Sequence, residues 1–229
     1  MKRFTSVFVA AVLGWMIVAP LAQAEDEKYF TIGSVEFSEV LREYDDSPVT
    51  PSDLGGDLGG AVVILDQVVN LGQKMWKLVE ENKPIVDWKE PPRATALPKG
   101  LENWTQLQGW QNPQARVYRV AFKNLYGVEV VNFKYRVSFT PGGSMKGKGG
   151  YLANVSVVPA ELSVAWGYKF NASAEVAEVL NAGTQEAPVA GLEVLVRWQV
   201  DTVLKHDRGT GAFFVRGDGG YKDLTRGEK

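Results

Sequence analysis

From residue 115 to residue 216 the chain repeatedly alternates large apolar residues with polar ones, and this period of two constrains the fold more than any other feature. Within residues 131–139, valine and aromatic residues occupy every odd position, whereas polar residues such as Lys134 and Arg136 occupy the even positions. Successive side chains of a strand point to opposite faces, so this pattern is typical of a strand with one buried face. It predicts a sheet that is packed on one side and solvated on the other.

Segments of the same kind follow one another along the chain, separated by short stretches of glycine, proline and asparagine. Pro159 lies between two of them and indicates a strand end or a bulge. Short connections between successive strands favour an antiparallel meander. We therefore predict about six strands, over residues 118–122, 131–139, 151–157, 162–176, 192–200 and 212–216.

The segment Ala61–Glu81 has a different pattern, with apolar residues such as Ile64, Val68 and Leu71 recurring at intervals of three and four. This spacing predicts a helix, and its first half is apolar nearly all round, which is typical of a helix buried on more than one side. The expected fold class is thus α+β, with a curved antiparallel sheet packed around one long apolar α-helix.

Residues 1–24 are typical of a secretory signal peptide, because Lys2 and Arg3 precede an apolar run that ends in the small-x-small site Ala22–Ala24. We expect cleavage after Ala24, a periplasmic or secreted protein, and no transmembrane helix in the mature chain. Residues 25–60 then form an acidic segment with a glycine-rich hinge, and residues 61–229 form a single domain.

Composition makes several chemistries improbable. The chain has no cysteine and one histidine, His206, so thiolate sites and sites with two imidazoles are excluded. No Gly-x-Ser-x-Gly motif is present. The formal net charge is only −2, which does not indicate a nucleic-acid partner. We therefore expect a protein that is not an enzyme and that has no metal site and no cofactor.

Charge is distributed unevenly along the chain. Residues 25–60 hold ten acidic and two basic residues, whereas residues 114–171 hold eight basic and two acidic residues. The basic residues of the predicted strands alternate away from the apolar face, so they predict a surface for an anionic lipid, an envelope glycan or another envelope protein. The alternative is that they form a solvated face of the sheet or that residues 25–60 neutralise them within the chain. The candidate binding residues are Arg119, Lys123, Lys134, Arg136, Lys146 and Lys148.

Residues 84–113 contain five prolines together with Trp88, Trp104 and Trp110. Exposed, coplanar tryptophans stack on sugars, whereas buried ones fix a loop to a core. Taken together, these features predict an exported, non-catalytic bacterial envelope protein that binds an amphiphilic or anionic ligand or takes part in envelope assembly, with an oligomer possible. The alternatives are a secreted protein that binds or cleaves glycans through these tryptophans, and a component of an oligomeric β-pore.

Overall fold

The structure of the protein is a computed structural model, which describes residues 27–44, 61–64, 73–77, 79–80, 83–84, 93–101 and 103–225. The described chain is nearly all β, with two antiparallel sheets and no helix of seven or more residues. Its helical residues are a single turn at 27–29 and a 3-10 turn, Trp104–Gln106. None of the described residues therefore forms a helix that could cross a bilayer.

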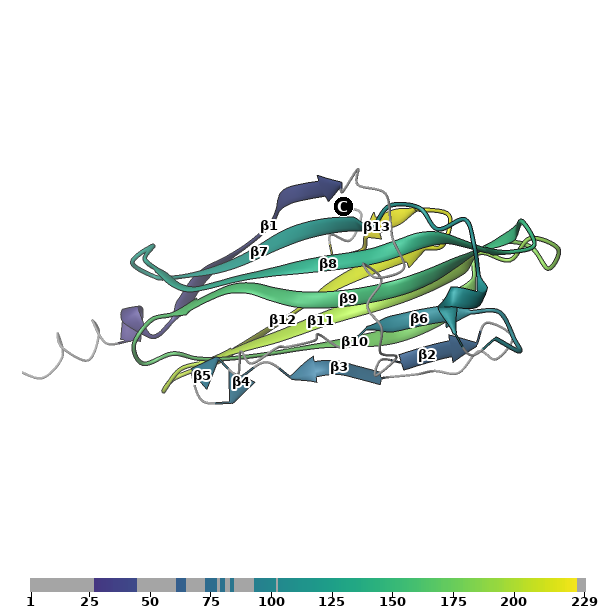
Figure 1. Ribbon diagram of the computed structural model, residues 1–229. Helices are drawn as coiled ribbons and strands as arrows, with labels where there is room; N and C mark the ends of the chain where they lie inside the picture. Colours follow the sequence, from purple (N-terminus) through teal and green to yellow (C-terminus); the bar gives the residue numbers. More distant parts are fainter. Residues whose placement is uncertain are drawn as a thin grey trace, which may run out of the picture.

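The first sheet is built around three strands that follow one another in the chain, with β1 added on one edge and β6 on the other (Figure 1). All neighbouring strands in the order β1-β7-β8-β9-β6 are antiparallel, and β2 continues the sheet by pairing in parallel with β6. The strands are β1 (Ile32–Tyr44), β2 (Ala61–Ile64), β6 (Ala94–Leu97), β7 (Gln114–Asn124), β8 (Glu129–Met145) and β9 (Lys148–Val164).

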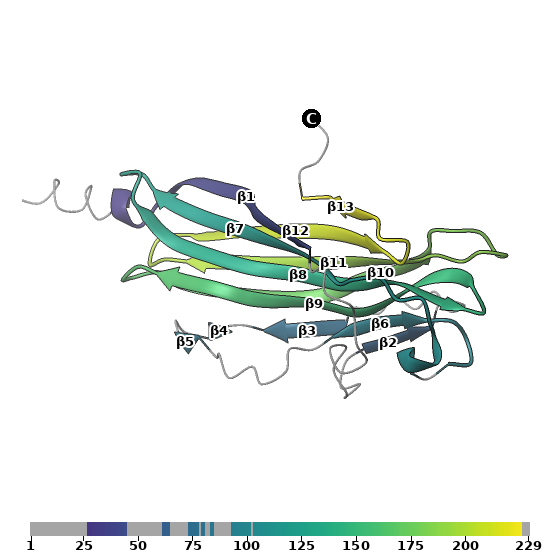
Figure 2. The same cartoon turned by 45° about the horizontal axis from the view of Figure 1, so that its top comes forward.

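The second sheet is a simple meander of four strands in the order β13-β12-β11-β10, with β3 on the outer edge of β10. It faces the first sheet, as Figures 1 and 2 show. The short strands β4 and β5 form a separate antiparallel pair. The strands are β3 (Gln73–Lys77), β4 (Val79–Glu80), β5 (Lys83–Pro84), β10 (Lys169–Asn181), β11 (Ala190–Asp201), β12 (His206–Arg216) and β13 (Tyr221–Asp223).

The core lies between the two sheets and is made by the inward positions of the alternating strands. Aromatic rings contact one another across the layers: Phe133 of β8 lies 5.0 Å from Phe170 of β10, and Tyr118 of β7 lies 4.5 Å from Phe213 of β12, between ring centroids. All four side chains are fully buried. Ring pairs of this kind add to the free energy of apolar burial, so these contacts hold the layers together.

The predicted helix at Ala61–Glu81 is wrong. The described parts of this segment are the strands β2, β3 and β4, which lie at the sheet edges or in the small separate pair. The α+β architecture is therefore replaced by two facing sheets, which supply each other's apolar cover. A short run of β-branched residues such as Ala61–Ile64 is equally compatible with a strand, and here β6 provides its hydrogen-bond partner.

The predicted strands after residue 115 are present, with two differences in their boundaries. The alternating run over residues 162–176 is two strands, because β9 ends at Val164 and a turn with Gly167 at φ +82° leads into β10. Pro159 lies inside β9, opposite Tyr135, next to a shift of register. It therefore marks a bulge, as the sequence indicated, and the chain crosses from the first sheet to the second only after Val164.

Candidate functional site

Four of the six basic residues proposed from the sequence, Arg119, Lys123, Lys134 and Arg136, lie on the outward faces of β7 and β8, where several of them contact acidic side chains. Lys123 Nζ lies 2.5 Å from Glu36 Oε1, and Lys134 Nζ lies 2.6 Å from Glu161 Oε2. Arg119, which is directly opposite Lys134 in the register, forms an ion pair with Glu129. The repulsion between like charges on neighbouring strands is thus relieved by acidic residues within the same sheet.

One of these contacts comes from the acidic N-terminal segment, which also supplies a partner for Arg116, a basic residue outside the six candidates. Glu36 and Glu39 on β1 pair with Lys123 and Arg116 on β7, the latter at 3.1 Å between Glu39 Oε1 and Arg116 Nη1. The hydrogen bond and the charge of Lys123 lower the pKa of the Glu36 carboxyl. Internal neutralisation by residues 25–60, one of the two alternatives drawn from the sequence, therefore accounts for part of the basic cluster.

The six predicted binding residues do not form one surface. Lys146 and Lys148 are exposed on the hairpin between β8 and β9, at the end of the sandwich away from the β7–β8 turn. Arg136 is exposed on the middle of β8, opposite Val158 of β9. Of the six, Arg136 is the residue that lines a hollow.

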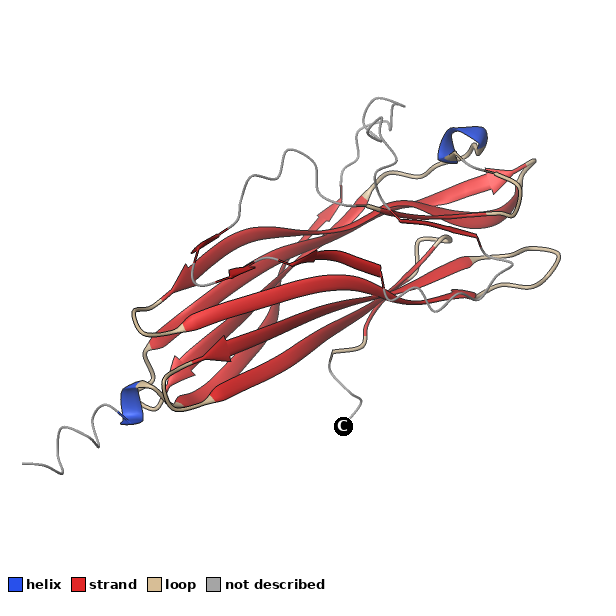
Figure 3. Ribbon diagram, turned by 90° about the horizontal axis from the view of Figure 1, so that it is seen from below, coloured by secondary structure: helices blue, strands red, loops and turns tan. Residues whose placement is uncertain are grey.

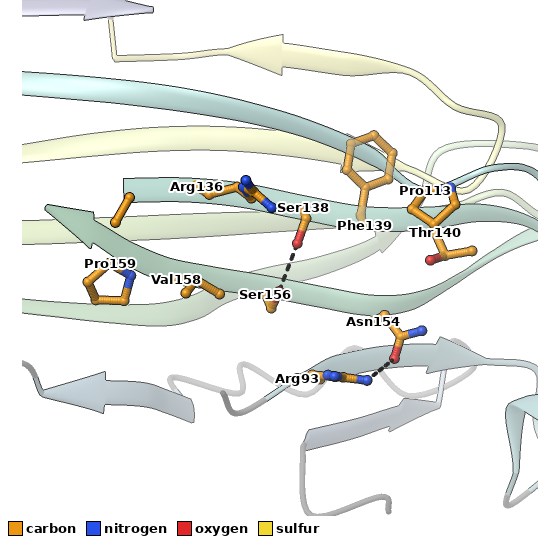
Figure 4. A pocket seen from close by; sticks show the side chains of 11 residues that line it. Arg93, Pro113, Arg136, Ser138, Phe139, Thr140, Asn154, Ser156, Val158 and Pro159 are labelled. Carbon is orange, nitrogen blue, oxygen red and sulfur yellow. Dashed lines mark hydrogen bonds between the residues drawn. The ribbon is translucent and has the colours of Figure 1, made fainter. Parts of the chain in front are cut away.

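That hollow is a groove of about 420 Å³ on the face of the first sheet that is turned away from the core (Figure 4). Its polar residues come from three parts of the chain. Arg136 and Ser138 belong to β8, Asn154 and Ser156 belong to β9, and Arg93 immediately precedes β6. The described lining contains no acidic residue, and its remaining members are Thr140 and the apolar residues Pro113, Phe139, Val158, Pro159 and Ala160.

Hydrogen bonds order the polar side chains of the groove. Ser138 and Ser156 face each other across the strands with 2.9 Å between their hydroxyl oxygens. Arg93 Nη1 donates to Asn154 Oδ1 at 3.4 Å. The groove thus combines two guanidinium groups with hydroxyl and amide groups, which is a set rich in hydrogen-bond donors. Such a set is suited to an anion that also carries hydroxyl groups.

Asn154 adopts a left-handed backbone conformation, with φ +53°, inside a β-strand. The register shifts here, because Ser138 is opposite Ser156 while Thr140 is opposite Ala153. A non-glycine residue in this region costs free energy, although asparagine tolerates it better than most residues. The bulge therefore places a strained residue at the groove. Backbone strain of this kind is common at functional sites.

The tryptophan alternative receives no support from the described residues. Trp104 is buried, and its ring meets the half-buried Trp110 edge to face, with centroids 6.2 Å apart. Trp110 in turn packs on Gly143, where an added Cβ would lie 2.4 Å from the indole. These two tryptophans fix the loop before β7 to the β8–β9 hairpin, and Trp88 lies outside the described residues.

A second polar cluster surrounds His206 at the start of β12. His206 Nδ1 lies 2.7 Å from Asp201 Oδ1, which also accepts a hydrogen bond from Gln199 Nε2 at 2.6 Å. The imidazole is exposed. Among the described residues, no group of three or more histidine and acidic side chains could hold a metal ion.

Two residues of the groove, Arg93 and Asn154, were not predicted from the sequence. Asn154 lies in an alternating strand, and nothing in its neighbours signals a bulge. Arg93 follows two prolines and reaches the groove only because β6 pairs with β9. The one usable signal is the polar face of β8 at Arg136 and Ser138.

No family model matches the chain, and no curated protein and no solved structure is similar to it at a significant level.

Proposed function

We propose that the protein is an exported, non-catalytic envelope protein that binds an anionic, hydroxyl-bearing ligand in the groove lined by Arg93, Arg136 and Asn154. The supporting observation is the coincidence, in one outward hollow, of two guanidinium groups, paired serine hydroxyls and a strained asparagine. A carboxylated sugar of an envelope glycan and a phosphorylated headgroup share the required chemistry.

The core supports this choice over an enclosed lipid site. Its buried apolar side chains form one cluster between the sheets, and the hollow described above opens on the opposite face of the first sheet. An amphiphile with a long chain needs apolar space, whereas the polar groups of the groove favour a charged head or an acidic sugar. We therefore favour a protein that binds its ligand at the surface over one that encloses a lipid.

The experiment measures binding by titration calorimetry with an oligomer of galacturonic acid, with glycerol phosphate and with a neutral glucose oligomer. We expect binding of at least one of the two anionic probes and none of the neutral oligomer. In the Arg93→Gln/Arg136→Gln variant the affinity should fall about tenfold to a hundredfold, since a charge-assisted hydrogen bond contributes about 1.5–3 kcal/mol.

The control is Arg197→Gln on the second sheet, whose guanidinium pairs with Glu175 outside the groove. It should bind like the unmodified protein. Equal binding of the neutral oligomer, or an unchanged affinity in the double variant, would refute the proposal. Preference for one anionic probe identifies the source of the charge.

A further inference from the structure

The turns 125–128, 165–168 and 202–205 lie at the same end of the sandwich (Figures 1 and 2). We call this the apolar end, because exposed apolar side chains gather on these turns. Register places these turns together. Ala165 N donates to Val130 O at 2.7 Å, next to the first turn, and Lys169 is opposite Asp201, next to the third. Six of the ten large apolar side chains that are exposed in the described chain lie here: Leu125, Tyr126, Val128, Trp166, Val203 and Leu204.

The turns that carry these side chains are internally hydrogen-bonded. Asn124 Oδ1 accepts from the backbone amides of Tyr126 and Val128, at 3.0 and 3.1 Å. Thr202 Oγ1 accepts from the backbone amides of Leu204 and Lys205, at 3.2 and 2.9 Å. Local bonds of this type fix turn geometry. The apolar side chains are therefore presented by ordered turns, which reduces the entropy lost when they bind a partner.

The N-terminal residues of the described chain join the same end. Phe30 packs against Trp166, with ring centroids 6.3 Å apart, and Tyr29 Oη donates to Trp166 O at 3.2 Å. Leu125 N donates to Thr31 O at 3.0 Å, so residues 29–31 connect two of the three turns. The apolar end is consequently one continuous structure built from four separate parts of the chain.

Exposure here is extreme for residues of this type. The exposed fraction is 83% for Trp166 and 76% for Val203. Single exposed apolar residues are common on protein surfaces, but a group gathered at one end is informative. Lys28, Lys169 and Lys205 are exposed beside these turns. Tryptophan with flanking lysine is the combination favoured at the interface between a bilayer and water, where lysine also attracts anionic headgroups.

We propose that the apolar end docks onto the surface of an anionic lipid bilayer. Trp166, Val203 and Leu204 insert into the interfacial region, and the three lysines lie among the headgroups. The described chain also begins at this end, at Glu27. This surface is distinct from the groove on β8 and β9, and the two proposals stand independently.

The test uses the full sequence exported by a bacterial host, with the N-terminus of each purified protein determined by mass spectrometry so that all variants are compared as the same species. Vesicles of phosphatidylcholine, with or without phosphatidylglycerol, are mixed with the protein and sedimented. We expect binding to the vesicles that contain phosphatidylglycerol, with a shift of tryptophan emission to shorter wavelength. Trp166→Phe should reduce that shift, since Trp166 is 83% exposed whereas Trp104 and Trp198 are buried and the half-buried Trp110 lies at the opposite end.

The Trp166→Ser/Val203→Ser variant should lose about tenfold or more in vesicle affinity, because it removes two of the inserted side chains. Met145→Ser is the matched control, since Met145 is also exposed on a hairpin but lies at the opposite end. Thermal unfolding confirms that each variant folds.

Three outcomes would overturn the proposal. They are absence of vesicle binding by the unmodified protein, equal binding by the double variant, and a dimer in lipid-free solution that the double variant abolishes while vesicle binding persists. The last outcome would assign the apolar end to a second copy of the chain.

Discussion

The two ends of the sandwich are built by different means. At the apolar end, side chains of residues 29–31 and of the β9–β10 turn connect the elements. At the other end, which we call the glycine end (residues 141–150, 182–189 and 217–220), the two sheets approach closely enough for their backbones to bond. Gly142 N donates to Gly217 O and Gly150 N donates to Pro188 O, both at 2.8 Å (Figure 3 shows the loops of both ends).

This difference shows that the fold itself does not require exposed apolar turns. The glycine end connects the same strands with small residues, and it exposes one large apolar side chain, Met145, among the described residues of its loops. The apolar residues at the opposite end are therefore not demanded by strand pairing or core packing. A function for them is the simpler explanation, and it motivates the bilayer proposal.

The largest effect on this comparison is expected from Gly217→Ala. An added Cβ would lie 2.1 Å from Gly150 O, so the backbones of the two sheets would have to separate. We expect a loss of about 3 kcal/mol or more in the free energy of unfolding, measured by urea denaturation. The control is Gly147→Ala, where φ is +74° and no atom lies within 4 Å, with an expected loss of about 1–2 kcal/mol. Equal losses would show that the close backbone contact is not what stabilises this end.

A smaller effect is expected from Gly167→Ala at the apolar end. Gly167 has φ +82°, and an added Cβ would lie 2.5 Å from the ring of Phe30. Gly127→Ala is the matched control, since its φ is +76° with no atom within 4 Å. Both variants should lose about 1–2 kcal/mol for the backbone conformation. Gly167→Ala should lose more and should increase amide exchange in residues 29–31. Identical unfolding and exchange in the two variants would mean that Phe30 does not hold this end together.

The smallest effect concerns alkaline pH. Burial raises the pKa of Tyr168, at the apolar end, to about 12, and it also raises the pKa of Tyr118 to about 12. Tyrosine in an unfolded chain has a pKa of about 10. The neutral form is thus favoured by the folded state, so this contribution to stability is complete below pH of about 10 and is lost as pH rises toward about 12.

Tyr168→Phe and Tyr118→Phe should each make this alkaline loss of melting temperature shallower. At neutral pH each removes a hydrogen bond, from Tyr168 to Tyr29 O and between Tyr118 and Tyr221, at a cost of about 1 kcal/mol. Because Tyr118 lies in the core between the sheets, the pair of variants reports whether the tyrosine of the apolar end or that of the core ionises first. A pH profile unchanged in both variants would contradict this account.

Most of the fold after residue 115 was predictable because its strands alternate cleanly and are joined in order. The number of layers was not, since alternation shows which residues are buried but not what covers them. We expected a helix at Ala61–Glu81 to cover the apolar face of the sheet, but the second sheet covers it. Turn signals also failed at residues 165–168, where Gly167 is the sole residue that favours a turn, so β9 and β10 were merged into one strand.

The candidate site was predictable only in part. Arg136 was identified from the polar face of β8, but Arg93 and Asn154 reach the groove through a strand pairing and a bulge that no local pattern signals. The charge of the basic cluster was overestimated, because its acidic partners lie on other strands. The acidic residues that neutralise it come from β1, β8 and β9. Cross-strand neighbours depend on register, which the sequence alone does not specify.

The pairing of β1 with β7 has a consequence for how the chain folds. Ile32 is opposite Asn124 and Tyr44 is opposite Gln114, so β1 is synthesised long before its partner. Strand pairs that are distant in sequence form slowly, and an unpaired strand is prone to aggregate in the interval. The carboxylates of Glu36 and Glu39, which later pair with β7, would meanwhile repel other copies of β1 and so protect the nascent protein until β7 is made.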